Sequence, residues 1–200
     1  MITLYGISAS RAFRCLWMLE ELGLEYEHVA TNFTGDNKQA DYLALNPNGR
    51  IPTLVDGDFV LWESLAINLY LAARYDGGLQ PKSIEDRALA TQWSFWAMTE
   101  VEKPLLELLF HSAILPEEQR NPSVRDAALK TLEAPFKVLD DTLAGREQLV
   151  SDRFCVGDLN VAAVLSWVRM ARHDLSTYPE IDRWLNACLG RPAAQAAQKA

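Results

Sequence analysis

The first 75 residues alternate short apolar runs with helix-like segments, and this alternation stops at Tyr75. Apolar periodicity predicts strands at residues 1–5, 24–31, 51–55 and 59–62. It predicts helices at residues 11–22, 37–45 and 63–74, with Gly23 as the C-cap of the first. The last two strands flank a tight Asp56-Gly-Asp turn, which indicates an antiparallel hairpin. The expected order of elements is therefore βαβαββα.

A βαβ unit joined to a ββα unit around a four-stranded sheet is the thioredoxin arrangement. The right-handed crossover rule leaves few other topologies for this order of elements. We therefore expect residues 1–75 to form a small thioredoxin-like α/β domain.

Residues 76–83 are rich in Gly, Pro and Ser and predict a linker, and residues 84–200 are expected to form one all-helical domain. A long helical segment from Ile84 to Phe110 is expected to bend or break near Pro104. Asn121-Pro122 predicts the start of a helix that ends near Leu143. Asn160 is expected to cap a later helix that runs to about His173. Pro179 and Pro192 are expected to open two more helices.

The formal net charge of −8 disfavours nucleic acid and anionic membranes as partners, because both require a basic surface. No apolar run approaches the length of a membrane span, and the chain starts without a secretory leader pattern. The 3 Cys and 3 His are widely scattered, so we expect reduced thiols and no metal site. These features predict a soluble cytoplasmic protein.

Ile51-Pro52 opens the third predicted strand, where a proline cannot donate to the sheet. A cis bond here would turn the Ile51 backbone N–H and C=O away from the sheet and towards a peptide-like ligand. An ordinary trans proline on an edge strand is the alternative.

Glu63-Ser64 lies where a strand end becomes a helix N-terminus. A carboxylate could dock on the amide and hydroxyl of Ser64, and Glu63 could accept an ammonium group, which together fit an α-amino-acid zwitterion. Plain helix capping is the alternative.

The turn after the first strand holds Ser8 and Ser10 at the entrance to the first helix. Either hydroxyl could donate to an anion beside the positive end of the helix dipole. The alternative for Ser10 is a role as N-cap only.

Taken together, these motifs resemble the cytosolic glutathione transferase family over essentially the whole chain. The matching segments are Leu4-Tyr-Gly, Ser10-Arg-Ala-Phe-Arg-Cys, Asn46-Pro-Asn-Gly-Arg-Ile-Pro, Trp62-Glu-Ser-Leu-Ala-Ile and Phe154-Cys-Val-Gly-Asp-Leu-Asn. The last segment resembles the family's capping box, with Asn160 as its expected N-cap and Ala163 in place of the usual Asp.

The resemblance implies a glutathione site in the first domain. Ile51, before a cis Pro52, would bind the cysteinyl main chain, and Glu63 and Ser64 the γ-glutamyl end. Lys38 and Arg50 would meet the glycyl carboxylate. Ser10, with Ser8 as the alternative, would stabilise the thiolate, whereas Cys15 lies too far into the helix and is interpreted as a buried structural thiol.

The resemblance also implies that a hydrophobic electrophile binds across a cleft, on the second domain. Positions on two neighbouring stripes of one helical segment and two further side chains are expected to line its site: Trp96 and Lys103 on one stripe, Thr99 on the other, and His111 and Trp167. The expected activity is conjugation of glutathione to this electrophile by a homodimer. A glutathione-dependent isomerase, dehalogenase or peroxidase, and a non-catalytic binding protein of the same fold, are the alternatives.

Overall fold

The computed structural model describes residues 1–75 and 77–200, so Asp76, the first residue of the expected linker, lies outside the described residues. The chain divides into two compact units. Unit 1 comprises Met1–Gln80 together with Arg191–Ala200, and unit 2 comprises Pro81–Gly190.

Unit 1 is built on a four-stranded sheet with the strand order β2-β1-β3-β4. The strands are β1 (Ile2–Tyr5), β2 (Tyr26–Val29), β3 (Thr53–Asp56) and β4 (Phe59–Trp62). β1 pairs in parallel with β2 and antiparallel with β3, and β3 forms the hairpin with β4. The expected thioredoxin-like βαβαββα order is confirmed.

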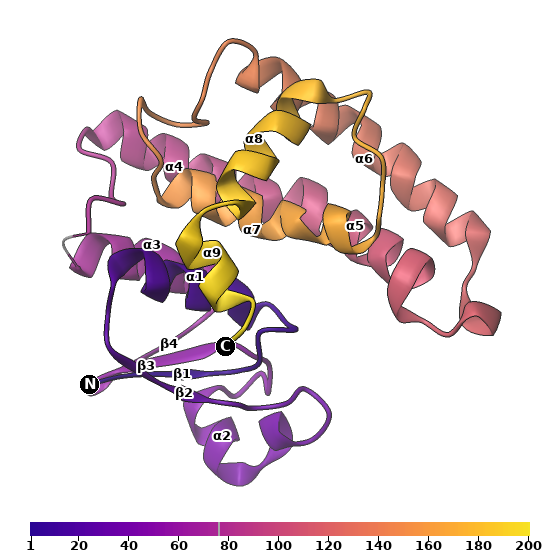
Figure 1. Cartoon of the computed structure of the whole chain (residues 1–200). Coiled ribbons are helices and arrows are strands. Elements are labelled where there is room, and N and C mark those ends of the chain that lie inside the picture. Colours follow the sequence, from indigo (N-terminus) through magenta and orange to yellow (C-terminus); the bar gives the residue numbers. More distant parts are fainter. Residues whose placement is uncertain (76) are drawn as a thin grey trace. The chain divides into compact units, whose positions relative to one another are not determined.

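Three helices of unit 1 are part of this order: α1 (Ala12–Leu22), α2 (Ala40–Leu45) and α3 (Ser64–Arg74). A short 3-10 turn, η1 (Asp36–Lys38), precedes α2, where the sequence predicted one helix over 37–45. Gly23 ends α1 in the left-handed conformation with φ 61°, as expected for a C-cap. α1 and α3 lie on one face of the sheet, and α2 lies away from that face (Figure 1).

The C-terminal helix α9 (Pro192–Ala197) belongs to unit 1 and packs on α1. Ala194 and Ala197 are buried, and the Arg191 guanidinium donates to both carboxylate oxygens of Glu21 at 2.6 and 2.8 Å. The sequence assigned the last ten residues to the helical domain of 84–200, whereas in the structure they group with unit 1. Small apolar side chains and the Arg191–Glu21 charge pair hold α9 against α1.

Unit 2 is helical throughout its regular elements. Its helices are α4 (Ile84–Trp96), α5 (Glu102–Leu109), α6 (Pro122–Leu143), α7 (Val156–Met170) and α8 (Pro179–Leu189). Asn121 accepts from the Ser123 N–H at 3.0 Å with Pro122 at the first helical position, which confirms the expected start of α6. A π-helical turn, η2 (Ala97–Val101), separates α4 from α5. Pro104 has no N–H to offer the Glu100 carbonyl, which accounts for the expected interruption.

The start of α7 differs from the prediction. Cys155, not Asn160, is the N-cap, and its thiol and the Asp158 carboxylate form the capping box with the backbone. Asn160 is instead fully buried one turn into α7, where its amide donates to the Ser94 hydroxyl at 2.8 Å. The expected cap at Asn160, with Ala163 in the place of Asp, is wrong because the box begins five residues earlier.

Candidate functional site

Three of the predicted motifs leave the sheet of unit 1 at the same edge. Tyr5 of β1 pairs with Thr53 of β3, and Thr53 pairs with Trp62 of β4. The residues that follow Tyr5, precede Thr53 and follow Trp62 therefore emerge together, although they are far apart in sequence. This edge holds the serine turn, the Ile51-Pro52 pair and the Glu63-Ser64 pair.

The Ile51-Pro52 peptide bond is cis, which resolves the two alternatives that the sequence left open. Within the described part of the chain, neither the N–H nor the C=O of Ile51 has a hydrogen-bond partner. Gly6 approaches the pair so closely that an added Cβ would lie 3.6 Å from the Ile51 Cβ and 2.6 Å from the Ala12 Cβ. The first turn of α1 and the Ile51-Pro52 pair are thus neighbours.

Ser64 is the first residue of α3 and is 4% exposed. Its hydroxyl accepts a hydrogen bond from the Arg14 guanidinium at 3.3 Å, and its carbonyl accepts one from the Cys15 thiol at 3.4 Å. Both contacts join the start of α3 to the first turns of α1. The preceding residue, Glu63, is exposed. Its backbone has φ 74° and ψ 109°, a conformation that residues other than glycine rarely adopt. Strain of this kind is often found at functional sites.

Cys15 is fully buried at this junction. Burial raises the pKa of its thiol far above the ordinary value, although the positive charge of Arg14 opposes this shift. Because the thiolate is the nucleophilic form, Cys15 is unsuited to reaction. This confirms its interpretation as a structural thiol.

The two candidate serines differ in their hydrogen bonds. The Ser10 hydroxyl donates to the Ile7 carbonyl at 2.6 Å and accepts from the Ala12 N–H at 3.1 Å, so it stabilises the entrance to α1. The Ser8 hydroxyl has no partner among the described residues. Both side chains are half-buried.

Two cations lie near the loop that leads into Ile51. The Lys38 ammonium donates to the Gly49 carbonyl at 2.8 Å, and the Asn37 amide donates to the same oxygen at 2.7 Å. Arg50 is exposed, and only its backbone carbonyl has a partner within the described residues. Lys38 and Gly49 are thus brought together by direct contact.

Two buried polar side chains that the sequence pattern did not predict form hydrogen bonds to this loop. Tyr42 and Asn46 both donate to the Arg50 carbonyl, and both also contact the Thr53 hydroxyl. The available signal was the Asn46-Pro-Asn-Gly turn, which predicts a loop and not a contact four residues later.

The predicted electrophile residues all lie in unit 2, but the two neighbouring helical stripes that the sequence spacing implied are not continuous. The π-helical turn η2 changes the rotation between Trp96 and Lys103, so spacing by 3.6 residues does not hold across it. Trp167 is only 8% exposed, and the His111 ring accepts from the Asn121 N–H at 3.1 Å. Thr99 and Lys103 are exposed, and Trp96 is half-buried with its ring 4.9 Å from that of Trp93.

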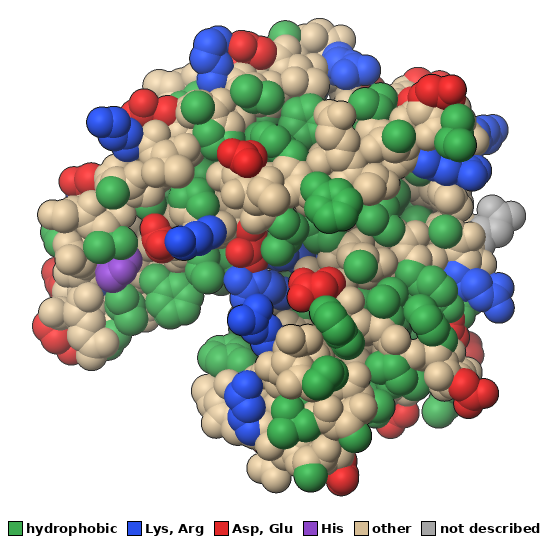
Figure 2. All heavy atoms as spheres, turned by 180° about the vertical axis from the view of Figure 1, so that it is seen from behind, with side chains coloured by type: hydrophobic (Ala, Val, Ile, Leu, Met, Phe, Trp, Pro, Cys, Tyr) green, Lys and Arg blue, Asp and Glu red, His purple; other side chains and the backbone are tan. Residues whose placement is uncertain are grey.

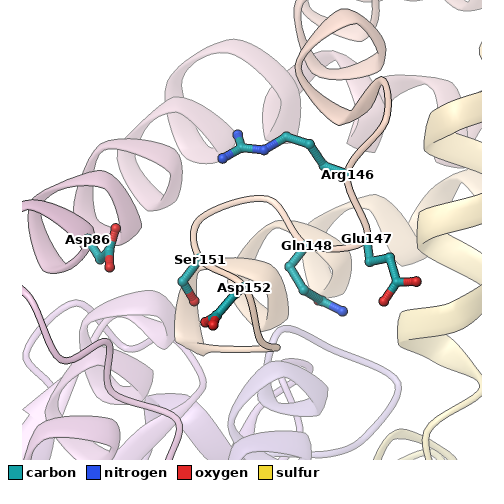
Figure 3. A pocket seen from close by; sticks show the side chains of 6 residues that line it. All are labelled: Asp86, Arg146, Glu147, Gln148, Ser151 and Asp152. Carbon is teal, nitrogen blue, oxygen red and sulfur yellow. The ribbon is translucent and has the colours of Figure 1, made fainter.

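A hollow of about 690 Å³ lies within unit 2, between the start of α4 and the loop that joins α6 to α7 (Figure 3). Six polar or charged residues line it: Asp86, Arg146, Glu147, Gln148, Ser151 and Asp152. This lining is unlike the apolar pocket expected for a hydrophobic electrophile. None of the predicted site residues contributes to it.

The described residues contain no cluster of three His, Cys, Asp or Glu side chains that could hold a metal ion. Across residues 1–75 and 77–200, the helices include none with the length and hydropathy of a membrane span. On the face drawn in Figure 2, acidic and basic side chains are interspersed.

A thioredoxin-like unit with a cis proline at the start of its third strand, followed in sequence by a helical unit, is the architecture of glutathione transferases. Residues 1–73 match the family described as glutathione S-transferase, N-terminal domain, and residues 102–192 match glutathione S-transferase, C-terminal domain. The chain belongs to the glutathione S-transferase family.

Individual relatives agree with this assignment. Glutathione S-transferase GstB of Escherichia coli (strain K12) is 36% identical over 200 residues, which cover 98% of this chain and 96% of the relative. Glutathione S-transferase D6 of Drosophila melanogaster is 30% identical, over 90% of this chain and 84% of its own length.

Among solved structures, a theta class glutathione S-transferase from Xanthomonas axonopodis pv. citri with glutathione bound has a TM-score of 0.90. It is 32% identical in sequence, and the match covers 100% of this chain and 97% of that one.

Proposed function

We propose that the chain is a glutathione transferase that binds glutathione at the sheet edge of unit 1 and conjugates it to a hydrophobic electrophile. The observation that carries the proposal is the backbone of Ile51, unpaired among the described residues, at the same edge of the sheet as the buried Ser64 at the start of α3. A peptide-like ligand needs backbone partners, and this edge offers both a donor and an acceptor.

Each part of glutathione has a partner of suitable chemistry. The Ile51 N–H and C=O pair with the main chain of the cysteinyl residue. The γ-glutamyl carboxylate accepts from the Ser64 N–H and hydroxyl at the positive end of the α3 dipole, and Glu63 binds the ammonium group. Lys38 and Arg50 hold the glycyl carboxylate. This local positive charge offsets the net charge of −8, which repels an anionic tripeptide.

Ser10 is the proposed catalytic residue. A thiol with a pKa near 8.5 needs about 2.7 kcal/mol to lower that pKa by two units. A hydrogen bond to an ion contributes about 1.5–3 kcal/mol and a helix end about 0.3–1 kcal/mol, so together they are sufficient. To donate to the sulfur, the Ser10 hydroxyl must turn its proton away from the Ile7 carbonyl. Ser8 has no such competing partner and remains the alternative.

In the proposed reaction the thiolate attacks an electrophilic carbon, a C–S bond forms, and the leaving group departs with its bonding electrons. The rate follows from the larger thiolate fraction and from proximity. The proposed electrophile surface lies in unit 2, where Thr99, Lys103 and Trp96 are accessible. His111 and Trp167 are weaker candidates for this surface. The His111 ring already accepts a hydrogen bond from the Asn121 N–H, and Trp167 is almost fully buried.

A homodimer forms part of the proposal. Apolar side chains reach the surface of both units, among them Phe59 and Trp62 of β4, at 45% and 39% exposure, and Phe95 of α4, at 67%. Exposed aromatic side chains are typical of interaction surfaces. Light scattering after size-exclusion chromatography tests this part, and a mass of one chain at micromolar concentration contradicts it.

The proposed function is tested with purified protein and two measurements. Isothermal titration with glutathione is expected to show binding in the micromolar to millimolar range, and S-hexylglutathione should compete. Conjugation of 1-chloro-2,4-dinitrobenzene with glutathione is expected to exceed the uncatalysed rate. Absence of both binding and conjugation overturns the proposal, whereas binding without turnover of any electrophile in a panel indicates a non-catalytic binding protein.

A further inference from the structure

Four polar groups form a buried ring of hydrogen bonds that includes the residues on either side of Ile51-Pro52 in the sequence, Arg50 and Thr53. The Tyr42 hydroxyl lies 2.6 Å from the Arg50 carbonyl oxygen and 2.8 Å from the Thr53 hydroxyl. The Asn46 amide nitrogen lies 2.8 Å from the same carbonyl and 3.2 Å from the same hydroxyl. Tyr42, Asn46 and Thr53 are 6%, 2% and 0% exposed. Water therefore has little access to these groups.

Counting protons assigns a direction to every bond in the ring. Asn46 has two N–H protons, and it gives one to the Arg50 carbonyl and one to the Thr53 hydroxyl. Tyr42 has one proton, which it gives to the Arg50 carbonyl, so Thr53 must donate its own proton to Tyr42. Every donor is used once. The Arg50 carbonyl accepts two bonds and is fixed from two directions.

The Arg50 carbonyl and the Ile51 N–H belong to the same peptide unit. Because this unit is planar and its C=O and N–H point in opposite directions, fixing the carbonyl also fixes the direction of the N–H. The ring holds the carbonyl against α2 and β3. It therefore aims the Ile51 N–H away from this buried network.

We propose that Tyr42 is a positioning residue, which orients the Ile51 N–H for glutathione through its hydrogen bond to the Arg50 carbonyl. This inference rests on the proposed function. Tyr42 is buried, so its effect on a ligand is exerted through Ile51. Its ring also packs edge-on against Tyr5, with centroids 6.0 Å apart, which restrains the ring independently of the hydroxyl.

Tyr42→Phe tests the inference, because it removes only the hydroxyl and keeps the packing of the ring. The matched control is Tyr26→Phe. Tyr26 lies on β2 of the same unit, and the variant removes a hydroxyl that donates to Glu20 at 2.7 Å. We expect Tyr42→Phe to raise the KM for glutathione about three- to tenfold with kcat changed less than about twofold, because ground-state binding is lost. Tyr26→Phe should leave KM within about twofold.

A second measurement does not depend on glutathione. In a ¹H–¹⁵N spectrum of the free protein, the Ile51 amide should give one sharp signal in the wild type and a shifted or broadened signal in Tyr42→Phe. If the wild type does not bind glutathione, the proposed function fails, but this signal still decides the role of Tyr42. An Ile51 amide that is unchanged in Tyr42→Phe overturns the inference in either case.

A double variant separates orientation from general stability. Tyr42→Phe leaves the buried Thr53 proton without an acceptor, which lowers stability whatever the role of Tyr42. Thr53→Val in the same chain removes that proton, so the melting temperature should recover towards that of Thr53→Val alone. The KM for glutathione should stay raised, because the Arg50 carbonyl still lacks its Tyr42 donor. Recovery of KM together with the melting temperature contradicts a positioning role.

Discussion

The Arg14 guanidinium donates to the Ser64 hydroxyl across 3.3 Å, and both side chains are buried, at 1% and 4% exposure. Because arginine can only donate, the hydroxyl oxygen is the acceptor, and the Ser64 proton remains available for another acceptor. The nearby positive charge polarises the hydroxyl and makes it a stronger donor. The Ser64 hydroxyl can thus donate its proton to an anion at the start of α3.

Ser64→Ala should weaken glutathione binding. The variant loses a hydrogen bond to a carboxylate, which corresponds to about a tenfold or greater rise in Kd. Isothermal titration measures the effect, and Ser176→Ala, in a loop of unit 2, is the control that should bind like the wild type. Equal affinity of Ser64→Ala and the wild type would remove Ser64 from the proposed site.

Ser10→Ala should reduce turnover in a pH-dependent way. If the hydroxyl lowers the pKa of bound glutathione, its loss returns that pKa towards about 8.5, so the rate falls most at low pH. We expect about a 10- to 100-fold loss of kcat at pH 6.5 that shrinks towards pH 9. A profile of kcat against pH checks this, and the same pattern in Ser8→Ala, with Ser10→Ala unaffected, would transfer the role to Ser8.

Local signals in the sequence predicted elements whose ends are fixed by local chemistry. Gly23 ends α1, and Asn121-Pro122 starts α6, because a left-handed turn and a side-chain cap depend on neighbouring residues only. The cap of α7 was predicted wrongly because Asn is a common N-cap and Cys is not, although the Asp158 carboxylate makes Cys155 effective. The position of α9 depends on contacts with α1, which no local pattern encodes.

The candidate site shows the same division. Ile51-Pro52 and Glu63-Ser64 are pairs of neighbouring residues whose effect on the backbone can be read locally, and the sheet register brings them to one edge. Arg14 and Tyr42 contact these motifs from positions that are remote in sequence: Arg14 donates to Ser64, and Tyr42 donates to the Arg50 carbonyl. The sequence did not predict these two contacts, because they depend on distances that only the fold determines.

Asp56→Asn should remove a pH-dependent part of the stability. Burial tends to raise the pKa of Asp56, but hydrogen bonds from Tyr75 at 2.7 Å and Tyr70 at 2.8 Å, with nearby positive charge, hold it below its ordinary value. A depressed folded pKa gives stability that is present above the unfolded pKa of about 3.9 and is lost as pH falls through the folded pKa.

Urea unfolding at several pH values measures this contribution. The difference in unfolding free energy between wild type and Asp56→Asn should be largest above about pH 5 and shrink below about pH 4. The double variant Tyr70→Phe/Tyr75→Phe should lose the same pH-dependent part. A difference that stays constant across this range would show that the carboxylate charge is not involved.

Asp140→Ala should destabilise unit 2 through α8. One Asp140 oxygen accepts from the N–H groups of Glu180 and Ile181, both at 2.9 Å, and so caps α8 from α6. Loss of a cap and of its charge at a helix N-terminus costs about 1–2 kcal/mol. Asp141→Ala is the matched control, because the Asp141 carboxylate forms an exposed pair with Lys137, whose loss should cost less than about 0.5 kcal/mol. Equal midpoints for the two variants in chemical denaturation would exclude the capping role.

Arg191→Gln should destabilise unit 1, because it leaves the Glu21 carboxylate without its charged partner. The Glu21 side chain is 7% exposed and also accepts from the Trp17 indole N–H at 3.0 Å, so water cannot readily replace Arg191. Breaking a buried pair on one side costs about 3–5 kcal/mol, and the partial exposure of Arg191 at 37% reduces the expected loss to about 1–3 kcal/mol. Arg125→Gln, which removes an exposed pair with Asp126, is the control and should change stability by less than about 0.5 kcal/mol.

Glu21→Gln in the Arg191→Gln background distinguishes the charge from the packing of α9. The double variant has no unpaired carboxylate, so its unfolding free energy should rise above that of Arg191→Gln alone. Deletion of 191–200 should cost more than either variant, because it also exposes the α1 surface that Ala194 and Ala197 cover. If the deletion leaves the melting temperature unchanged, the last ten residues do not contribute to the stability of unit 1, and its boundary would have to be drawn at Gln80.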